Sequence, residues 1–421
     1  MVDQALAVSI IESLRTGIPP LRGVREYSAG NEEFLDQILK RHLRNAPDIR
    51  GKIRFISGSW GTGKSHFLAQ IRETAFESNY LVSSVGLSAD ETPFNRFEEV
   101  FYRIVRQIAS PEMYSEGAVA LDAPLGEVFR RQLFKPHGAA PQAAVPREIY
   151  DKACQELMEN GEIDIDFRRL VCRYWETYLP EAGDVALLED RRGRIMQWFS
   201  GEGTIGAYRK EFGVQKLVNR SNARLLLRSL GRYAIHAGFS GIVVLLDEAE
   251  MSYSVMRKSA LKTAHNNLLH LINSIEESPG LFLVYATTPD FYTDERHGIQ
   301  IYGALAQRIG RPEERPPRAL DRVWNLEYLQ PTLADYSAAA RKIRSLYIAA
   351  YPEYRQAVLN EGSLDTFVKE LLDAHPRFSA VGFWRVLVKG VIELFERQAA
   401  GDEIPSAAQL HSNIIDELKE L

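Results

Sequence analysis

The fold of this chain is decided by residues 52–77, which read KIRFISGSWGTGKSHFLAQIRETAFE. Residues 52–57 predict a short buried strand, because isoleucine and phenylalanine supply its apolar positions. Residues 66–77 carry apolar side chains at helical spacing. Between these elements, GSWGTGKS has the GxxxxGK[ST] pattern of a phosphate-binding loop. A strand before this pattern and a helix after it are the context that the pattern requires.

Each position of the loop has a mechanical reason. Glycines allow backbone N–H groups to point inward around an anion, and the positive end of the helix that starts near Lys64 faces the same anion. We expect Lys64 to reach the β- and γ-phosphates of a nucleotide and the Ser65 hydroxyl to ligate Mg²⁺. The alternative is a glycine turn without a ligand. The predicted nucleotide-binding residues here are Gly58, Ser59, Trp60, Gly61, Thr62, Gly63, Lys64, Ser65 and His66.

An acidic pair supplies the second half of the predicted site. Residues 241–247, GIVVLLD, are apolar and largely β-branched up to Asp247, which predicts a central strand buried on both faces. We expect Asp247 to hold Mg²⁺ through water, and Glu248 to polarise an attacking water as general base. The alternative is a surface pair that ends a strand. An aspartate followed by a glutamate favours hydrolysis of ATP over phosphate transfer to a small molecule.

Threonines end a further predicted parallel strand, residues 280–287. In the additional-strand class of phosphate-loop ATPases, a polar residue here lies between the two motif strands and contacts the γ-phosphate or the attacking water. Thr287 or Thr288 fits that role, and Thr288 is our candidate. The alternative is a pair of strand-end threonines without a catalytic part.

Arginines gather in the segment that follows. Five of them fall within fifteen residues: Arg308, Arg311, Arg315, Arg318 and Arg322. In oligomeric ATPases, an arginine of this region reaches the γ-phosphate of the neighbouring subunit, and Arg308 and Arg311 are our candidates. The alternatives are a solvated basic loop or a contact with nucleic-acid phosphates. Arg377 begins a predicted helix and has the position of an arginine that senses nucleotide from a lid, or is simply an exposed helix-start residue.

The bulk composition excludes several classes. With 421 residues and a net charge of −5, the whole molecule does not attract nucleic acid, so any such contact needs a local basic patch. Cys154 and Cys172 lack the spacing of a zinc site or a redox pair and are predicted to be reduced core residues of a cytoplasmic protein. No run approaches the roughly 18 apolar residues of a membrane helix. Asp3 and Glu12, within the apolar pattern of the N-terminus, argue against a signal peptide.

The motif spacing predicts the organisation of the chain. Lys64 and Asp247 lie 183 positions apart, and the extra length falls after a second predicted strand, residues 80–87. The predicted fold is α/β, a three-layer core with a parallel sheet, a large helical insertion and a helical C-terminal lid. The predicted divisions are 1–88 for N-terminal helices and the first part of the core, 89–235 for the insertion, 236–330 for the second part of the core, and 331–421 for the lid.

The order of these parts resembles the AAA+ ATPases, especially the branch near origin-recognition and STAND-type proteins. A closer resemblance is to the ATP-binding proteins of BREX phage-defence systems (BrxD-like). It is carried by softer motifs than the phosphate loop: IIESLRTGIPPLRGVREYSAG at 10–30, RIMQWFSGE at 194–202, HAGFSGIVVLLDEAE at 236–250, and MSYSVMRKSALKTAHNNLLHLI at 251–272.

The resemblance implies what composition and spacing do not. It implies packing of residues 22–27 on the adenine base, a homo-oligomer, and antiviral defence beside DNA or DNA-modifying proteins. It also agrees with ATP and Mg²⁺, the ligands that the phosphate loop and the acidic pair predict. One alternative is a nucleotide-gated binding module, in which ATP sets assembly. Another is a DNA-loading protein like the replication initiators. In both alternatives, ATP controls assembly or loading, whereas in an ATP-driven motor its hydrolysis powers movement.

Overall fold

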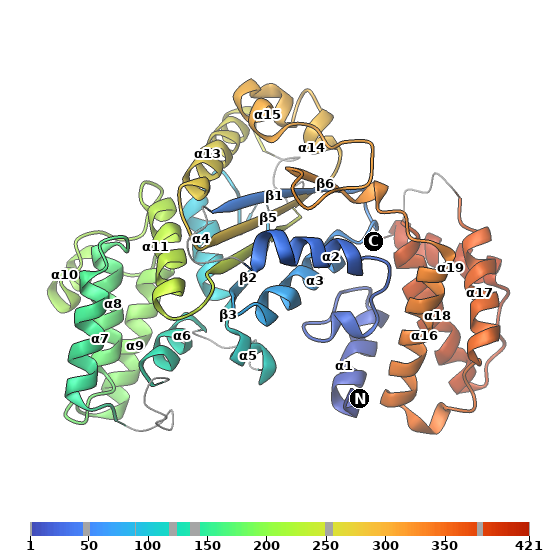
Figure 1. The fold of residues 1–421 in the computed structure, drawn as a ribbon, viewed down its shortest axis with the longest axis horizontal. Coiled ribbons are helices and arrows are strands. Elements are labelled where there is room, and N and C mark those ends of the chain that lie inside the picture. The colour runs from blue at the N-terminus through green and yellow to red at the C-terminus, as the bar shows by residue number, and fades with distance from the viewer. Residues whose placement is uncertain are drawn as a thin grey trace.

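A central β-sheet stands between two helical bodies, as Figure 1 shows. The computed structural model describes residues 2–44, 51–88, 90–117, 124–134, 144–248, 256–376 and 382–420. One helical body comes from the middle of the chain and the other from its C-terminal part. The predicted α/β class is therefore confirmed.

The sheet has six strands in the order β3-β2-β4-β5-β1-β6. The strands are β1 (Lys52–Ser57), β2 (Leu81–Gly86), β3 (Ile108–Ala109), β4 (Ile242–Asp247), β5 (Leu281–Thr287) and β6 (Val323–Asn325). All neighbours are parallel except β2 and β3. As predicted, β5 lies between the strands of the two motifs. Strand β6 forms an edge of the sheet. The short strand β3 falls in a region predicted to be helical.

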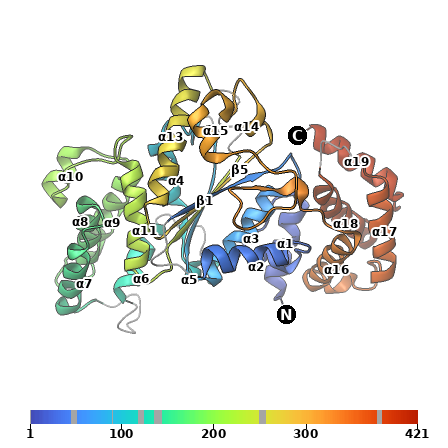
Figure 2. The ribbon, with the colours of Figure 1, turned by 45° about the horizontal axis from the view of Figure 1, so that its top comes forward.

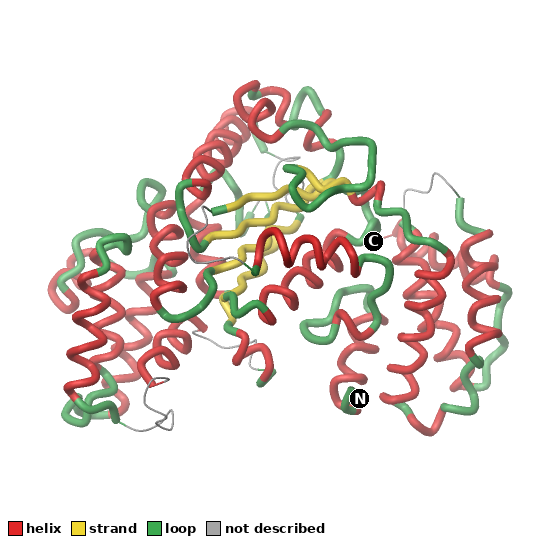
Figure 3. Tube along the Cα trace, viewed as in Figure 1, coloured by secondary structure: helices red, strands yellow, loops and turns green. Residues whose placement is uncertain are grey.

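Helices cover both faces of the sheet, which gives three layers, as Figures 2 and 3 show. On one face, α2 (Glu32–Ile38), with the π-helical turn η2 (Leu39–Leu43), and α3 (Lys64–Glu77) pack on a core that includes Val243, Val284 and Trp324. On the other face, α4, α11, α13 and α15 pack on a core that includes Val244 and Tyr285. Their bounds are α4 (Phe97–Arg106), α11 (Ala223–His236), α13 (Lys258–Glu276) and α15 (Gly303–Ile309), preceded by α14 (Asp290–Thr293) and η4 (Ile299–Ile301).

The middle of the chain builds a helical body beside the sheet. It contains α5 (Pro111–Ser115), α6 (Pro124–Phe134), α7 (Arg147–Glu159), α8 (Ile165–Glu176), α9 (Val185–Phe199) and α10 (Ile205–Phe212). Aromatic rings join these helices to α11: Phe129 lies 5.1 Å from Tyr233 and 6.1 Å from Phe167 between ring centroids. One apolar core runs from this body onto the sheet. The core therefore does not mark where the helical insertion begins and ends, and the predicted boundaries at 89 and 235 stay predictions.

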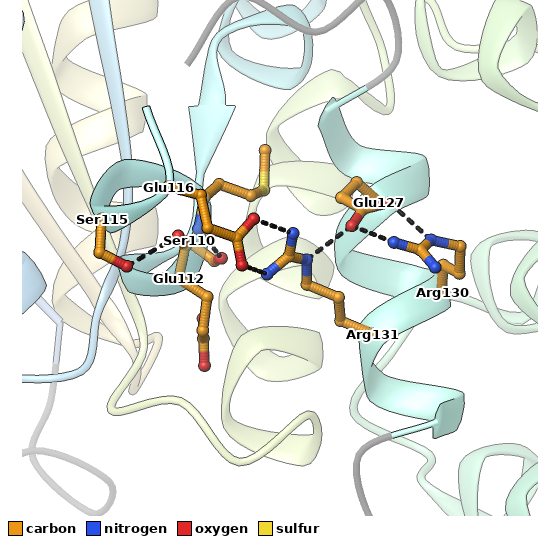
Figure 4. Close-up of polar contacts among 8 residues, drawn as sticks. Ser110, Glu112, Ser115, Glu116, Glu127, Arg130 and Arg131 are labelled. Atoms are coloured by element: carbon orange, nitrogen blue, oxygen red, sulfur yellow. Dashed lines mark hydrogen bonds and ion pairs between the residues drawn. The ribbon is translucent and has the colours of Figure 1, made fainter. Parts of the chain in front are cut away.

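Ion pairs tie α5 to α6, as Figure 4 shows. Arg131 binds Glu116 at 2.6 Å and Glu127 at 2.6 Å, and Glu127 also binds Arg130 at 2.5 Å. At the start of α5, the Ser110 hydroxyl accepts the Met113 N–H, a normal helix cap. These charges are therefore shared within the helical body.

The C-terminal bundle is formed by α16 (Leu333–Ala350), α17 (Glu361–Asp373), α18 (Phe383–Ala400) and α19 (Ala407–Glu420), with η6 (Pro352–Tyr354) between α16 and α17. The first helix, α1 (Gln4–Arg15), packs into the same core through four buried apolar side chains, Ala7, Ile10, Ile11 and Leu14. In addition, the Gln4 side-chain amide donates to the Ala350 carbonyl at 3.0 Å. The N-terminal helix thus belongs to the core of the C-terminal bundle.

Cys154 is half-buried, Cys172 is buried, and both are free thiols. Within the ranges described, no helix is long and apolar enough to cross a membrane.

Candidate nucleotide-binding site

The phosphate loop connects β1 to α3 through two left-handed glycines. Gly61 has φ +78° and Gly63, the N-cap of α3, has φ +93°. Other residues rarely adopt this conformation, so glycine is required at both positions. The Lys64 side chain is buried and turned back on the loop, where its ammonium donates to the Gly58 carbonyl at 2.8 Å and to the Ser59 carbonyl at 3.3 Å.

A cavity of about 1160 Å³ opens beside this loop, large enough for a nucleotide. The predicted residues Trp60, Gly61, Thr62, Gly63, Lys64, Ser65, His66, Asp247 and Glu248 all line it. Its other walls come from the N-terminal stretch, from the segment after β6, and from α16 and α18 of the C-terminal bundle. The fold therefore brings the predicted loop and the predicted acidic pair together.

The acidic pair lies at the end of β4, and β5 separates this strand from β1, the strand that leads into the loop. Parallel register places Asp247 level with Gly86 of β2. Glu248 has φ +55°, unusual for a residue with a side chain, and its N–H donates to the Asp247 carboxylate at 2.9 Å. Burial raises the pKa of the Glu248 carboxyl, Asp247 raises it further, and Lys64 offsets part of the shift. A carboxyl with a raised pKa is better matched to accepting a proton near neutral pH.

The two threonines at the end of β5 differ in their surroundings. Thr287 is fully buried, and its hydroxyl donates to the Ile56 carbonyl at 3.1 Å and contacts the Tyr292 hydroxyl at 3.1 Å. Thr288 is also buried. Neither threonine is among the residues that line the cavity, so the role predicted for Thr288 stays a prediction.

The two candidate arginines lie away from the cavity of their own chain. Arg308 on α15 forms an ion pair with Glu276, which also binds Arg322 at 2.7 Å. Arg311 follows α15 and is exposed; it forms no ion pair or hydrogen bond with the described part of the chain. Of these two candidates, Arg311 is therefore the one that offers its guanidinium to a second molecule without breaking a contact.

An arginine that sequence reasoning missed lines the cavity from the C-terminal bundle. Arg377 lies outside the described residues, and the described helix α18 begins at Phe383. Arg385, in the first turn of α18, lines the cavity, and its buried Nε has no hydrogen-bond partner among the described residues. A signal was available, because a cation in a first helical turn is opposed by the helix dipole. An anionic ligand would explain that placement.

Two hydrogen bonds join the loop to its surroundings, one to the start of the bundle helix α18 and one to η5 (Leu326–Tyr328), which follows β6. The Gly382 N–H donates to the Trp60 carbonyl at 3.3 Å, and a Cβ on Gly382 would lie 2.2 Å from the Gly61 carbonyl oxygen. On the other side, the Glu327 carboxylate accepts the Ser59 N–H at 2.5 Å. Neither contact was predicted.

The N-terminal stretch η1 (Val24–Glu26) leads to the opposite wall of the cavity. Tyr27 and Ser28 line the cavity, and their hydroxyls lie 3.0 Å from the two ring nitrogens of His66. Burial lowers the pKa of His66 to about 4, so its ring is neutral at physiological pH. Within residues 22–27, the stretch predicted to pack on the adenine base, Tyr27 is the residue that lines the cavity. The Arg22 guanidinium instead lies 5.8 Å from the centroid of the Tyr114 ring.

A glycine loop between a parallel strand and a helix, facing an acidic pair across one cavity, defines a phosphate-loop nucleotide-binding protein. The model of the BREX system ATP-binding protein BrxC/D family matches residues 2–413. The chain belongs to this family, and the resemblance seen in the sequence is confirmed. Comparison with curated proteins gave no match, and neither did comparison with solved structures.

Proposed function

We propose that this BREX-family ATP-binding protein hydrolyses ATP with Mg²⁺ and acts as an AAA+-like switch in anti-phage defence. The observation that carries the proposal is that Lys64, Ser65, Asp247 and Glu248 line one cavity. They supply a cation for the phosphates, a hydroxyl and a carboxylate for a metal, and a base for water. Hydrolysis of ATP requires all of these groups, whereas nucleotide binding alone does not.

The residues present fit both ATP and Mg²⁺. The orphaned Arg385 Nε and the glycines of the loop suit a phosphate anion. Ser65 and Asp247 offer two oxygen ligands, and Mg²⁺ typically takes few from protein because phosphates and water complete its shell. When bound, Mg²⁺ would neutralise charge that develops on the phosphates.

We assign Glu248 as the general base. Its carboxylate follows the end of β4, is exposed, and lines the same cavity as the phosphate loop. A water bound to this carboxylate would therefore lie in the cavity that receives the phosphates. Thr288 is retained as a candidate to orient that water. The strained φ of Glu248 supports a functional part, because such conformations persist where the structure imposes them.

Assembly and partners are the less direct part of the proposal. The AAA+ class is supported by β5 between the motif strands and by a helical bundle that borders the cavity. In a cytoplasmic homo-oligomer, exposed Arg311, or Arg308 after release from Glu276, would reach a neighbour's phosphate. Other defence proteins or DNA would be recognised outside the ATP site, and the helical region 89–235 is our candidate for that contact.

A second candidate is a nucleotide-gated assembly of the origin-recognition or STAND type. The contact of Gly382 with Trp60 favours it, because a ligand at the loop would act directly on the bundle. Size-exclusion chromatography with ATP, with ADP and without nucleotide separates the two. Gating predicts assembly that follows ATP and survives loss of hydrolysis.

The decisive experiment measures binding and turnover separately. Lys64→Ala should abolish ATP binding, whereas Glu248→Gln should bind ATP and not hydrolyse it. Glu403→Gln, an exposed carboxylate beyond α18, is the matched control and should behave as wild type. Wild-type turnover in purified Glu248→Gln would refute the hydrolytic assignment.

A further inference from the structure

Glu327 stands beside the phosphate loop because of strand register. Strand β6 pairs with β1 so that Asn325 lies level with Ser57, the last residue before the loop. The turn η5 (Leu326–Tyr328) follows at once and brings the Glu327 carboxylate to the Ser59 N–H at 2.5 Å. Glu327 also lines the cavity.

A buried anchor fixes this carboxylate. The Asn325 side chain is buried, accepts the Glu327 N–H at 3.3 Å, and donates to the Glu313 carbonyl at 3.0 Å. Glu327 itself is exposed and forms no ion pair within the described part of the chain. An uncompensated negative charge is therefore held against a loop that should receive an anion.

The charges around the cavity are unbalanced. Among the described residues that line it, the cationic side chains are Lys64 and Arg385, and the anionic ones are Asp247, Glu248 and Glu327. Asp247 and Glu248 end β4, whereas Glu327 follows β6, on the other side of the loop strand. Phosphates in the loop would thus meet carboxylates on both sides, and a bare triphosphate would be repelled more strongly than one whose charge a divalent cation has halved.

We propose that Glu327 is a specificity-determining residue that makes this site select metal-complexed nucleotide over the free triphosphate. The proposal rests on the proposed function, because it concerns the same cavity. Asp247 has a metal to offset its charge when the site is filled. Glu327 lies on the far side of the loop, where Ser59 holds it, and no metal offsets its negative charge. Glu327 therefore repels the nucleotide in proportion to the net negative charge that the nucleotide retains.

Glu327→Gln tests this with little change of shape. The amide oxygen still accepts the Ser59 N–H, so only the charge is lost. Affinity for ATP would be measured at low ionic strength, with Mg²⁺ and separately with excess EDTA. For charges on the order of 10 Å apart in a water-like dielectric, we expect roughly tenfold tighter binding of free ATP and roughly threefold tighter binding of the Mg²⁺ complex. The preference for the complex should therefore fall about threefold.

Controls separate this inference from the proposed function. Glu403→Gln should leave both affinities unchanged, and circular dichroism would verify folding of each variant. An unchanged preference in Glu327→Gln, or equal weakening of both affinities, would overturn the inference and leave a structural role for the Ser59 contact. Wild-type protein that binds ATP under neither condition would instead overturn the proposed function, and with it this inference.

Discussion

The backbone contact between Gly382 and Gly61 makes one substitution unusually informative. In Gly382→Ala, the new Cβ would lie 2.2 Å from the Gly61 carbonyl oxygen and 2.9 Å from the Thr62 nitrogen. Both neighbours are backbone atoms, which no side-chain rotation can move away. Gly382 itself has φ −67° and ψ 143°, a conformation that alanine adopts freely. The cost therefore arises only at the contact between loop and bundle.

The size of the effect follows from this geometry. Overpacking costs about 1–3 kcal/mol in well-packed sites. Part of the bundle must shift away from the loop, because α18 begins directly after residue 382. If that cost falls on the closed arrangement that surrounds a nucleotide, affinity for ATP should drop roughly fivefold to a hundredfold. Isothermal titration with ATP and Mg²⁺ measures it.

A second glycine provides the control. Gly193 lies within α9, and a Cβ there would meet nothing within 4 Å. Gly193→Ala should therefore stabilise the protein by about 0.5–1 kcal/mol and leave ATP affinity unchanged. Wild-type affinity in Gly382→Ala, with a wild-type thermal midpoint, would refute the reasoning, because it would mean that loop and bundle are apart in solution.

Two further outcomes are expected. Arg385→Ala should weaken ATP binding by roughly tenfold to a hundredfold in the same titration, the worth of a hydrogen bond to a charged group, with little change in thermal midpoint. Burial alone would raise the pKa of Glu127, but hydrogen bonds from Arg130 and Arg131 outweigh it and hold that pKa below its ordinary value. This stabilisation is present above the unfolded pKa and disappears as pH falls through the folded one. The difference in thermal midpoint between wild type and Glu127→Gln should thus be constant from pH 7 to about 5.5 and shrink as pH falls below about 4.5; a difference that grows as the pH is lowered would contradict it.

The strands and the loop could be predicted because their signals are local. The apolar run that ends in Asp247 specifies a strand buried on both faces, and β4 lies between two parallel neighbours as that pattern requires. The glycine pattern at 58–65 needs only its own residues to form. The long interval between the motifs also indicated a helical body before any contact was known.

The partners of the loop could not be predicted in this way. Ser59 and Glu327 are 268 positions apart, and no periodicity links them. Arg385 was not predicted, because α18 begins at Phe383 and not at the helix start that the sequence indicated near Arg377. Arg377 lies outside the described residues, so its role stays a prediction. Strand β3 was missed since two residues, Ile108 and Ala109, cannot display an alternating pattern.

The placement of α1 in the core of the C-terminal bundle also has a consequence for biosynthesis. Its partner α16 begins more than 300 residues later, so at about 5–20 residues per second the ribosome needs roughly 15–65 s to deliver it. Throughout that interval the apolar face of Ala7, Ile10, Ile11 and Leu14 lacks the part of its native core that α16 and the helices after it supply. Bringing α1 and α16 together is also slow, because closing so long a loop costs conformational entropy. Helix α1 therefore leaves the ribosome long before α16 and is among the last elements to dock, so chaperones would meet its apolar face.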